Sequence, residues 1–298
     1  MPCPSTSALP GAVADAPEVL WLGDRRAHDP ALAGGKAASL SRLAAAHAVP
    51  PGFVLSLPAA ALNRRARTAV FAAYRRLAER VGEAAPAVAV RSSAVDEDGA
   101  DASFAGQHDT FLNVSGPEQV WWAVARCVAS FGGDRALAYR RRSGRPAAPP
   151  RAAVLVQRLV AADAAGVVFS ANPVTGARDE AVVNAAWGLG ESVVSGTVTP
   201  DAIVVAHVDG AIRSHTVAEK RTMIVAVPGG TREVPVPGSL AREPAVDAAQ
   251  ARAAARLALA LERETGAPVD VEVAWAGAEL VLLQCRPITT LRTQQEHQ

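Results

Sequence analysis

The sequence predicts an α+β or α/β protein of two lobes with a cleft between them. Strand-like apolar runs alternate with helical patterns in the first half of the chain, and the second half is richer in strands. A segment dense in Pro and Ala, 144–150, reads as the linker between the halves. The length of 298 residues and a hydrophobic content of 50% allow one large or two modest domains.

The first half carries alternating strand and helix signals. Val70, Tyr74, Leu77 and Val81 recur at helical spacing. Glycines precede the helix expected after Gly34, and Pro50-Pro51-Gly52 ends that unit. We therefore expect strands at 19–22, 53–55, 88–93 and 110–114, helices at 34–43, 64–81 and 117–142, and an acidic loop at 96–101.

The second half is predicted to contain strands at 154–157, 166–170, 181–183 and 203–205, a helix at 245–264, and a hairpin of 269–273 with 280–287. The expected division is a flexible leader at 1–17, a first lobe at 18–150, a second lobe at 151–290 and a polar tail at 291–298.

Composition excludes several classes of protein. A net charge of +1 indicates neither nucleic acid nor an anionic membrane as the main partner. The three cysteines are scattered, without metal-ligand spacing or a disulfide framework, which favours a cytoplasmic setting. The N-terminus lacks the features of a signal peptide, and no apolar run is long enough to span a bilayer.

The C-terminal hairpin gathers polar groups among apolar neighbours. Side chains alternate along a strand, so Asp270 and Glu272 share one face, and Gln284 and Arg286 share one face of the paired strand. Carboxylate, amide oxygen and guanidinium groups that converge in this way suit a metal ion and a phosphate. A half-solvated hairpin with an ion pair explains the same pattern equally well.

Two further segments are candidate phosphate sites. Gly34-Gly35-Lys36 opens a helix, whose N-terminus attracts anions, although a glycine turn with a solvated lysine is the alternative. Arg91 ends an apolar strand before Ser92-Ser93, and arginine matches phosphate oxygens in bidentate geometry. The alternative for Arg91 is an ion pair with Asp96 or Asp98 that holds the loop.

Other motifs carry less information. Asn172 to Gly176 is typical of a tight turn, and the glycines of 187–196 suit either a close approach to a ligand or an ordinary loop. His215 is expected on an exposed strand.

In this order the motifs identify a family. The matching stretches are GGKAASLSRL, VPPGFVLS, VAVRSSAVDEDGADASFAGQHDTFLNV, VLVQRLVAADAAGVVFSANPVTG, AAWGLGESVVSGTVTPD and GAPVDVEVAW…LVLLQCRPIT. The chain resembles the N-terminal ATP-binding domain of the phosphoenolpyruvate synthase and pyruvate phosphate dikinase family, which the rifampicin phosphotransferases also carry. The resemblance runs from about residue 20 to residue 290.

The resemblance implies an ATP-grasp fold, in which two α+β lobes hold ATP between them, with ATP and Mg²⁺ as cofactors. It implies these site residues: Lys36 and Arg91 as phosphate-binding cations, Glu272 and Gln284 as the magnesium-binding pair, Arg286 facing the transferring phosphates, Thr110 as a phosphate contact, and Gln157 on the strand that leads to the hinge beside adenine.

Two departures from the family shape the expected function. The motif of the phosphorylated histidine is missing, and the stretch Phe53–Val88 is shorter than the family's usual insert. We therefore expect a split enzyme that uses Mg–ATP to phosphorylate a histidine on a separate partner protein, for onward transfer to a small-molecule acceptor. The alternatives are a stand-alone ATP-grasp kinase or ligase acting directly on a small molecule, and a non-catalytic nucleotide-binding module.

Overall fold

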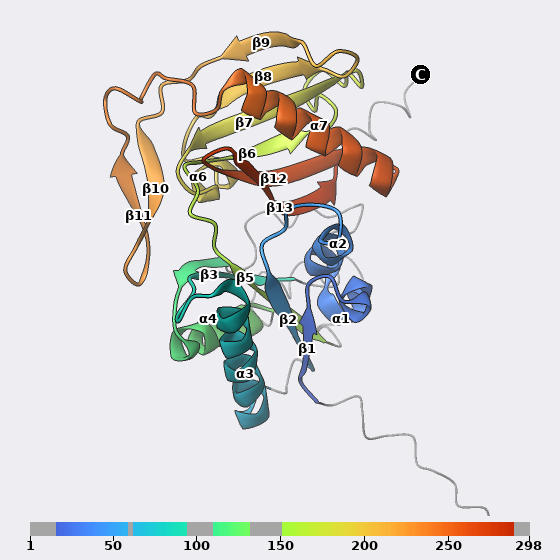
Figure 1. The fold of residues 1–298 in the computed structure, drawn as a ribbon, viewed down its shortest axis with the longest axis vertical. Coiled ribbons are helices and arrows are strands. Elements are labelled where there is room, and N and C mark those ends of the chain that lie inside the picture. The colour runs from blue at the N-terminus through green and yellow to red at the C-terminus, as the bar shows by residue number, and fades with distance from the viewer. Residues whose placement is uncertain (1–15, 59–61, 94–109, 132–150, 289–298) are drawn as a thin grey trace, which may run out of the picture.

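The structure is a computed structural model that describes residues 16–58, 62–93, 110–131 and 151–288. Figure 1 shows two lobes stacked along the long axis, each built on its own β-sheet. The first lobe is formed by β1 (Glu18–Trp21), a 3₁₀ turn (Arg25–His28), α1 (Pro30–Ala33), α2 (Gly35–Leu43), β2 (Gly52–Leu57), α3 (Arg64–Val81), β3 (Val88–Ser92), β4 (Thr110–Val114), α4 (Pro117–Ser130) and β5 (Ala152–Arg158).

The second lobe follows along the chain. It is formed by β6 (Ala164–Phe169), β7 (Glu180–Trp187), α6 (Glu191–Val194), β8 (Asp201–Ala206), β9 (Ile212–Thr216), the hairpin of β10 (Thr222–Val227) and β11 (Gly230–Pro235), α7 (Ala248–Thr265), β12 (Val269–Ala276) and β13 (Glu279–Pro287). The predicted helices and strands are present, except that α4 ends at Ser130. The rest of the helix expected to reach Arg142 and the acidic loop expected at 96–101 lie outside the described residues.

Both sheets are antiparallel, which decides between the two predicted classes in favour of α+β. The first has the order β1-β2-β5-β3-β4, and the second has the order β13-β12-β6-β7-β8-β9. Helices cover these sheets rather than connecting parallel strands, as expected for this class.

The strand pairing of β5 bears on the division between the lobes, which was expected at residue 150. Because β5 pairs with both β2 and β3, it is an inner strand of the first sheet rather than the opening strand of the second lobe. The Pro- and Ala-rich segment 144–150 lies outside the described residues. It is a local signal, whereas strand pairing depends on residues far apart in the chain. We propose that the lobes divide between Arg158 and Ala164, where the chain passes from one sheet to the other.

Local sequence signals set the ends of the main helices. The Asn63 side chain accepts hydrogen bonds from the backbone N–H groups of Arg65 and Ala66, and α3 ends at Gly82 with φ 70°. A capping box of Asp247 and Gln250 starts α7. None of the described helices is long and apolar enough to cross a membrane.

Two apolar cores flank the first sheet. One lies between that sheet and the helices α3 and α4, with Phe53, Tyr74 and Leu77 at its centre. The other begins at α1 and α2 and continues into the space between the second sheet and α7, where Trp275 and Leu261 are buried. Because α2 contributes to a core shared with the second lobe, one side of the cleft is held by apolar packing.

A fully buried ion pair organises the second lobe around the base of the β10–β11 hairpin. Lys220 Nζ lies 2.6 Å from Asp201 Oδ1 and also donates to the carbonyl oxygen of Ala218. The other carboxylate oxygen of Asp201 accepts from the backbone N–H of Ala245. Both side chains are completely buried, so each charge depends on its partner.

Replacing Lys220 with Met is expected to lower the free energy of unfolding by about 3–5 kcal/mol, because the carboxylate of Asp201 would stay buried without its cation. The matched control is Arg221→Met, since the neighbouring Arg221 side chain is 81% exposed. The control should change stability by less than about 0.5 kcal/mol. Equal effects of the two substitutions on denaturant unfolding would contradict this account.

Candidate nucleotide site

The polar face predicted on the β12–β13 hairpin forms as its alternation indicated. Asp270 pairs directly with Arg286, and Glu272 pairs directly with Gln284, so the four side chains share one face of the second sheet. The opposite face carries Val269, Val271 and Val273, which pack into the core beneath α7. The apolar residues therefore fix the register that turns the four polar groups toward the cleft.

Arg286 is held in place by Asp270. Its Nε donates to Asp270 Oδ2 at 2.8 Å, and its Nη2 lies 2.7 Å from the same oxygen. Burial raises the pKa of the Asp270 carboxyl, Arg286 opposes that shift, and the nearby Glu272 carboxylate adds to it. The sequence placed Asp270 on the same face as Glu272 but assigned it no role in binding, and the structure shows it as the partner of Arg286.

The first lobe supplies cationic and hydroxyl groups opposite this face. Arg91 Nη1 lies 3.8 Å from Glu272 Oε2, and both side chains are largely buried, with 17% and 18% exposure. Thr110 is the direct cross-strand partner of Arg91 on β4 and is exposed. The ion pair therefore joins β3 of one lobe to β12 of the other. The alternative partners of Arg91, Asp96 and Asp98, lie outside the described residues.

The helix α2, which carries Lys36, contacts the end of β3 and the strand β13. The hydroxyl of Ser93, two residues after Arg91, accepts a hydrogen bond from the backbone N–H of Ala37. Gly34 fits against Ser93 so closely that an added Cβ would lie 1.7 Å from its carbonyl oxygen, and its φ of 75° also favours glycine. At the same helix, Ser39 Oγ donates to the carbonyl oxygen of Cys285 on β13. The start of α2 is thus fixed between Arg91 and the β12–β13 hairpin.

Gln157 lies apart from these charged groups. It is only 2% exposed, and its Nε2 donates to the carbonyl oxygen of Pro50 at 3.1 Å. Gly52, its cross-strand partner on β2, lies so close to the β5 backbone that an added Cβ would be 2.6 Å from the carbonyl oxygen of Val156 and 2.9 Å from the Cα of Gln157. The observed role of the amide is to hold β5 to the start of β2, and its place beside adenine stays a prediction.

A pocket of about 220 Å³ adjoins the polar face. It is lined by Asp270, Glu272, Arg286, Asn184, Val167, Phe169, Val193, Val194 and Pro200. The apolar lining comes from β6, from α6 and from the segment that follows α6. Asn184, on β7, was not predicted as a site residue, because nothing in its local sequence distinguishes it from the apolar strand around it.

The remaining motifs are placed as the sequence indicated. Asn172 forms a tight turn, since its Oδ1 accepts from the backbone N–H groups of Val174 and Thr175. His215 lies on the exposed strand β9. In the glycine-rich segment after β7, Gly188 lies close to the carbonyl oxygen of Ile224 in β10, and α6 begins at Glu191. The close approach seen here is therefore to the chain's own backbone, and an approach to a ligand stays a prediction.

Two antiparallel lobes that face each other across cations, carboxylates and an amide define an ATP-grasp-type domain. The family model of the pyruvate phosphate dikinase AMP/ATP-binding domain matches residues 56–298. The chain belongs to this family.

Several similar proteins have names that match this family. A probable phosphoenolpyruvate synthase of Methanocaldococcus jannaschii is 36% identical over 92% of this chain and 27% of the relative. A rifampicin phosphotransferase of Streptomyces sviceus is 44% identical over 69% of this chain and 24% of the relative. A phosphoenolpyruvate synthase of Pyrococcus furiosus is 39% identical over 74% of this chain and 28% of the relative. The chain thus spans about a quarter of the length of these relatives.

Proposed function

We propose that this chain is the ATP-using part of a phosphotransferase, which phosphorylates a histidine on a separate partner protein for onward transfer to a small acceptor. The observation that carries the proposal is the meeting of Arg91 with Glu272 across the two lobes, beside the Arg286–Asp270 pair. A cation from one lobe and a carboxylate from the other meet here. Such a pair suits a triphosphate with its metal ion, since the cation can neutralise phosphate charge and the carboxylate can bind the metal.

In this proposal the cations bind and orient the phosphates. Lys36, Arg91 and Arg286 offset the negative charge, and Thr110 donates its hydroxyl next to Arg91. Positioning and electrostatic stabilisation are the main means of catalysis in phosphoryl transfer. Because Asp270 holds the guanidinium of Arg286 before any ligand arrives, little reorganisation is needed when the transferring charge develops.

Glu272 and Gln284 fit Mg²⁺ by their chemistry. They offer a carboxylate and an amide oxygen as direct cross-strand neighbours, and Mg²⁺ in nucleotide enzymes is commonly bound by one or two carboxylates together with phosphate oxygens. When bound, the ion neutralises phosphate charge. Before the ion binds, Arg91 partly neutralises the Glu272 carboxylate. The carboxylate therefore has a cationic partner in the ligand-free protein and Mg²⁺ as its partner in the loaded site.

A histidine acceptor is proposed to come from another polypeptide segment. The described histidines, His28, His47, His207 and His215, are not among the residues that line the pocket. The relatives named phosphoenolpyruvate synthase and rifampicin phosphotransferase are themselves about four times as long as the matched part. We also propose a cytoplasmic setting, in keeping with Cys127 and Cys285 being buried thiols.

A second candidate is direct transfer to a small molecule. The apolar wall of the pocket, formed by Val193, Val194 and Pro200, lies beside Glu272 and Arg286. A small acceptor with an apolar part fits such a wall. In this case ATP consumption depends on a metabolite and needs no second protein.

The test is transfer of labelled phosphate from ATP. The chain is incubated with Mg²⁺, with ATP labelled in its β- and γ-phosphates, and with candidate phosphohistidine-domain proteins. The proposal predicts acid-labile label on a partner histidine, and chromatography of the nucleotide product separates AMP-forming from ADP-forming chemistry.

Two controls define the outcome. Mg–ATP should raise the melting temperature of the chain more than ATP with a chelator, because binding to the native state stabilises it. If binding occurs but only small metabolites stimulate ATP consumption, the second candidate replaces the first. If Mg–ATP causes no stabilisation at millimolar concentration, the chain is not a phosphotransferase component.

A further inference from the structure

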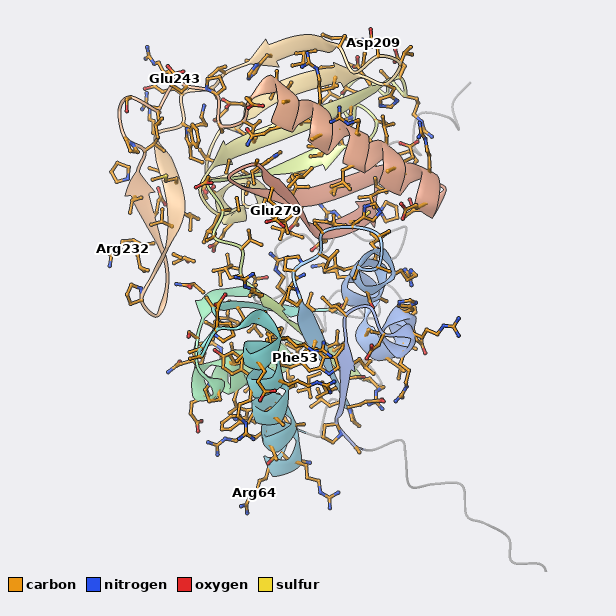
Figure 2. All side chains as sticks on the ribbon, viewed as in Figure 1. Phe53, Arg64, Asp209, Arg232, Glu243 and Glu279 are labelled. Carbon is orange, nitrogen blue, oxygen red and sulfur yellow. The ribbon has the colours of Figure 1, made fainter. Side chains whose placement is uncertain are left out.

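The β10–β11 hairpin extends from the second lobe to the first. Its strands are mostly half-exposed, and Figure 2 shows Arg232 pointing away from both lobes. At its base, the backbone of Lys220 donates to Ala241, and the buried Lys220–Asp201 pair fixes that segment to β8. Little apolar burial holds the rest of the hairpin, so its position depends on a few directed contacts.

The body of the hairpin lies against the segment that walls the pocket. Gly188 forms a parallel bridge with Ile224, and the N–H of Leu189 donates to the carbonyl oxygen of Ile224 at 2.8 Å. The hydroxyl of Thr231 lies 3.5 Å from a carboxylate oxygen of Glu191, at the start of α6. The hairpin therefore contacts the α6 segment, whose residues Val193 and Val194 line the pocket.

Asn113 of the first lobe binds the tip of the hairpin. Asn113 Nδ2 donates to the carbonyl oxygens of Val227 and Gly230, both at 2.7 Å, which flank the Pro228–Gly229 turn. Both N–H groups of the amide can thus be used, one for each carbonyl. Figure 1 shows the hairpin descending beside the first lobe, where these contacts with β4 form.

The backbone at Asn113 is shaped for this contact. Among the non-glycine residues that the structure describes, Asn113 alone has a positive φ, of 56°. The pairing of β3 with β4 is irregular between Val88 and Val90, so Asn113 lies in a bulge, and bulges redirect side chains. The left-handed conformation is unfavourable for most residues and is best tolerated by Gly and Asn. An outlier of this kind points to a functional contact.

We propose that Asn113 is a positioning residue that latches the β10–β11 hairpin across the two lobes and so holds the nucleotide site closed. The latch acts at both sides of the site. Asn113 is three residues from Thr110, the partner of Arg91 on the same strand pair, and the hairpin that it binds supports α6. Release of the hairpin frees the α6 wall and loosens the first lobe over Glu272. The effect on nucleotide binding rests on the proposed function, whereas the latch itself does not.

The test uses substitutions that separate the side chain from the backbone. Asn113→Gly keeps the left-handed conformation and removes both hydrogen bonds, whereas Asn113→Asp places acceptor oxygens against two carbonyls. Asn63→Ala is the matched control, since it removes the cap of α3 in the same lobe without touching the hairpin. Hydrogen exchange of the hairpin amides at 222–235 is measured without nucleotide, and Mg–ATP dissociation is measured by stopped flow.

Asn113→Gly is expected to speed exchange of the hairpin amides about tenfold and to raise the Mg–ATP dissociation rate by a similar factor, with a larger effect for Asn113→Asp. Asn63→Ala should change neither rate by more than about twofold. Hairpin protection equal to that of the wild type in Asn113→Gly overturns the latch. Faster exchange with an unchanged dissociation rate overturns the positioning role. If the wild type does not bind Mg–ATP, the proposed function fails, and the exchange experiment still decides the latch.

Discussion

Replacing Glu272 with Gln is expected to lower the rate of phosphoryl transfer by about 10²–10³-fold while leaving the fold intact. The substitution keeps the size and shape of the side chain but removes the carboxylate that we assign to Mg²⁺. It also removes the partner of Arg91, 3.8 Å away. The measurement is the initial rate of label transfer to the acceptor, together with thermal unfolding of the ligand-free protein.

The same substitution is not expected to weaken the binding of metal-free ATP. In the wild type, Glu272 repels a metal-free triphosphate and occupies Arg91. In Glu272→Gln both effects are gone, so ATP with a chelator should bind as tightly as to the wild type, or more tightly, although the enhancement by Mg²⁺ is lost. The matched control is Glu279→Gln, which changes an exposed carboxylate at the far end of the same hairpin (Figure 2). Wild-type rates in Glu272→Gln, or losses of equal size in the control, contradict the assignment.

Replacing Arg286 with Ala is expected to have a similarly large effect on turnover, about 10²–10³-fold, because it removes the guanidinium that we assign to the transferring phosphates. It should also lower the free energy of unfolding by about 1–3 kcal/mol. Asp270 is only 7% exposed, and Arg286 is the group that opposes the rise of its pKa, so removing the cation leaves a buried carboxylate without its partner.

A double substitution separates the two roles of Arg286. In an Asp270→Asn background, Arg286→Ala no longer leaves a charge behind, so most of the stability loss should disappear while turnover stays low. Denaturant unfolding and label transfer measured on the four proteins complete the cycle. Recovery of turnover in the double variant would show that Arg286 acts only through the fold. An unchanged stability loss would show that Asp270 is not its essential partner.

The amino-acid sequence by itself determined the local structure and most of the candidate site. Alternation along 269–273 and 280–287 placed Asp270, Glu272, Gln284 and Arg286 on one face, and the structure pairs them in that register. The helical spacing of Val70, Tyr74, Leu77 and Val81 predicted α3, and the structure shows that Asn63 and Gly82 cap it. These features depend on periodicity and capping, which act over a few residues, so they can be recognised from the sequence alone.

Features that depend on partners far along the chain were decided only by the tertiary structure. The strand β5 belongs to the first sheet because β2 and β3 pair with it, which the neighbouring Pro- and Ala-rich segment could not reveal. The β10–β11 hairpin was not predicted, although Pro228-Gly229-Gly230 is a turn signal, because its strands carry little of the apolar alternation of a buried sheet.

The contacts that join the two halves of the site also depend on residues far apart in the chain. Nothing local connects Arg91 to Glu272, Asn113 to Val227, or Lys220 to Asp201, and each contact exists because separate elements pack together. Short-range sterics and hydrogen bonding choose helix, strand and face from neighbouring residues. The free energy of burying apolar surface chooses which elements meet, and that choice brings cations of one lobe to the carboxylates of the other.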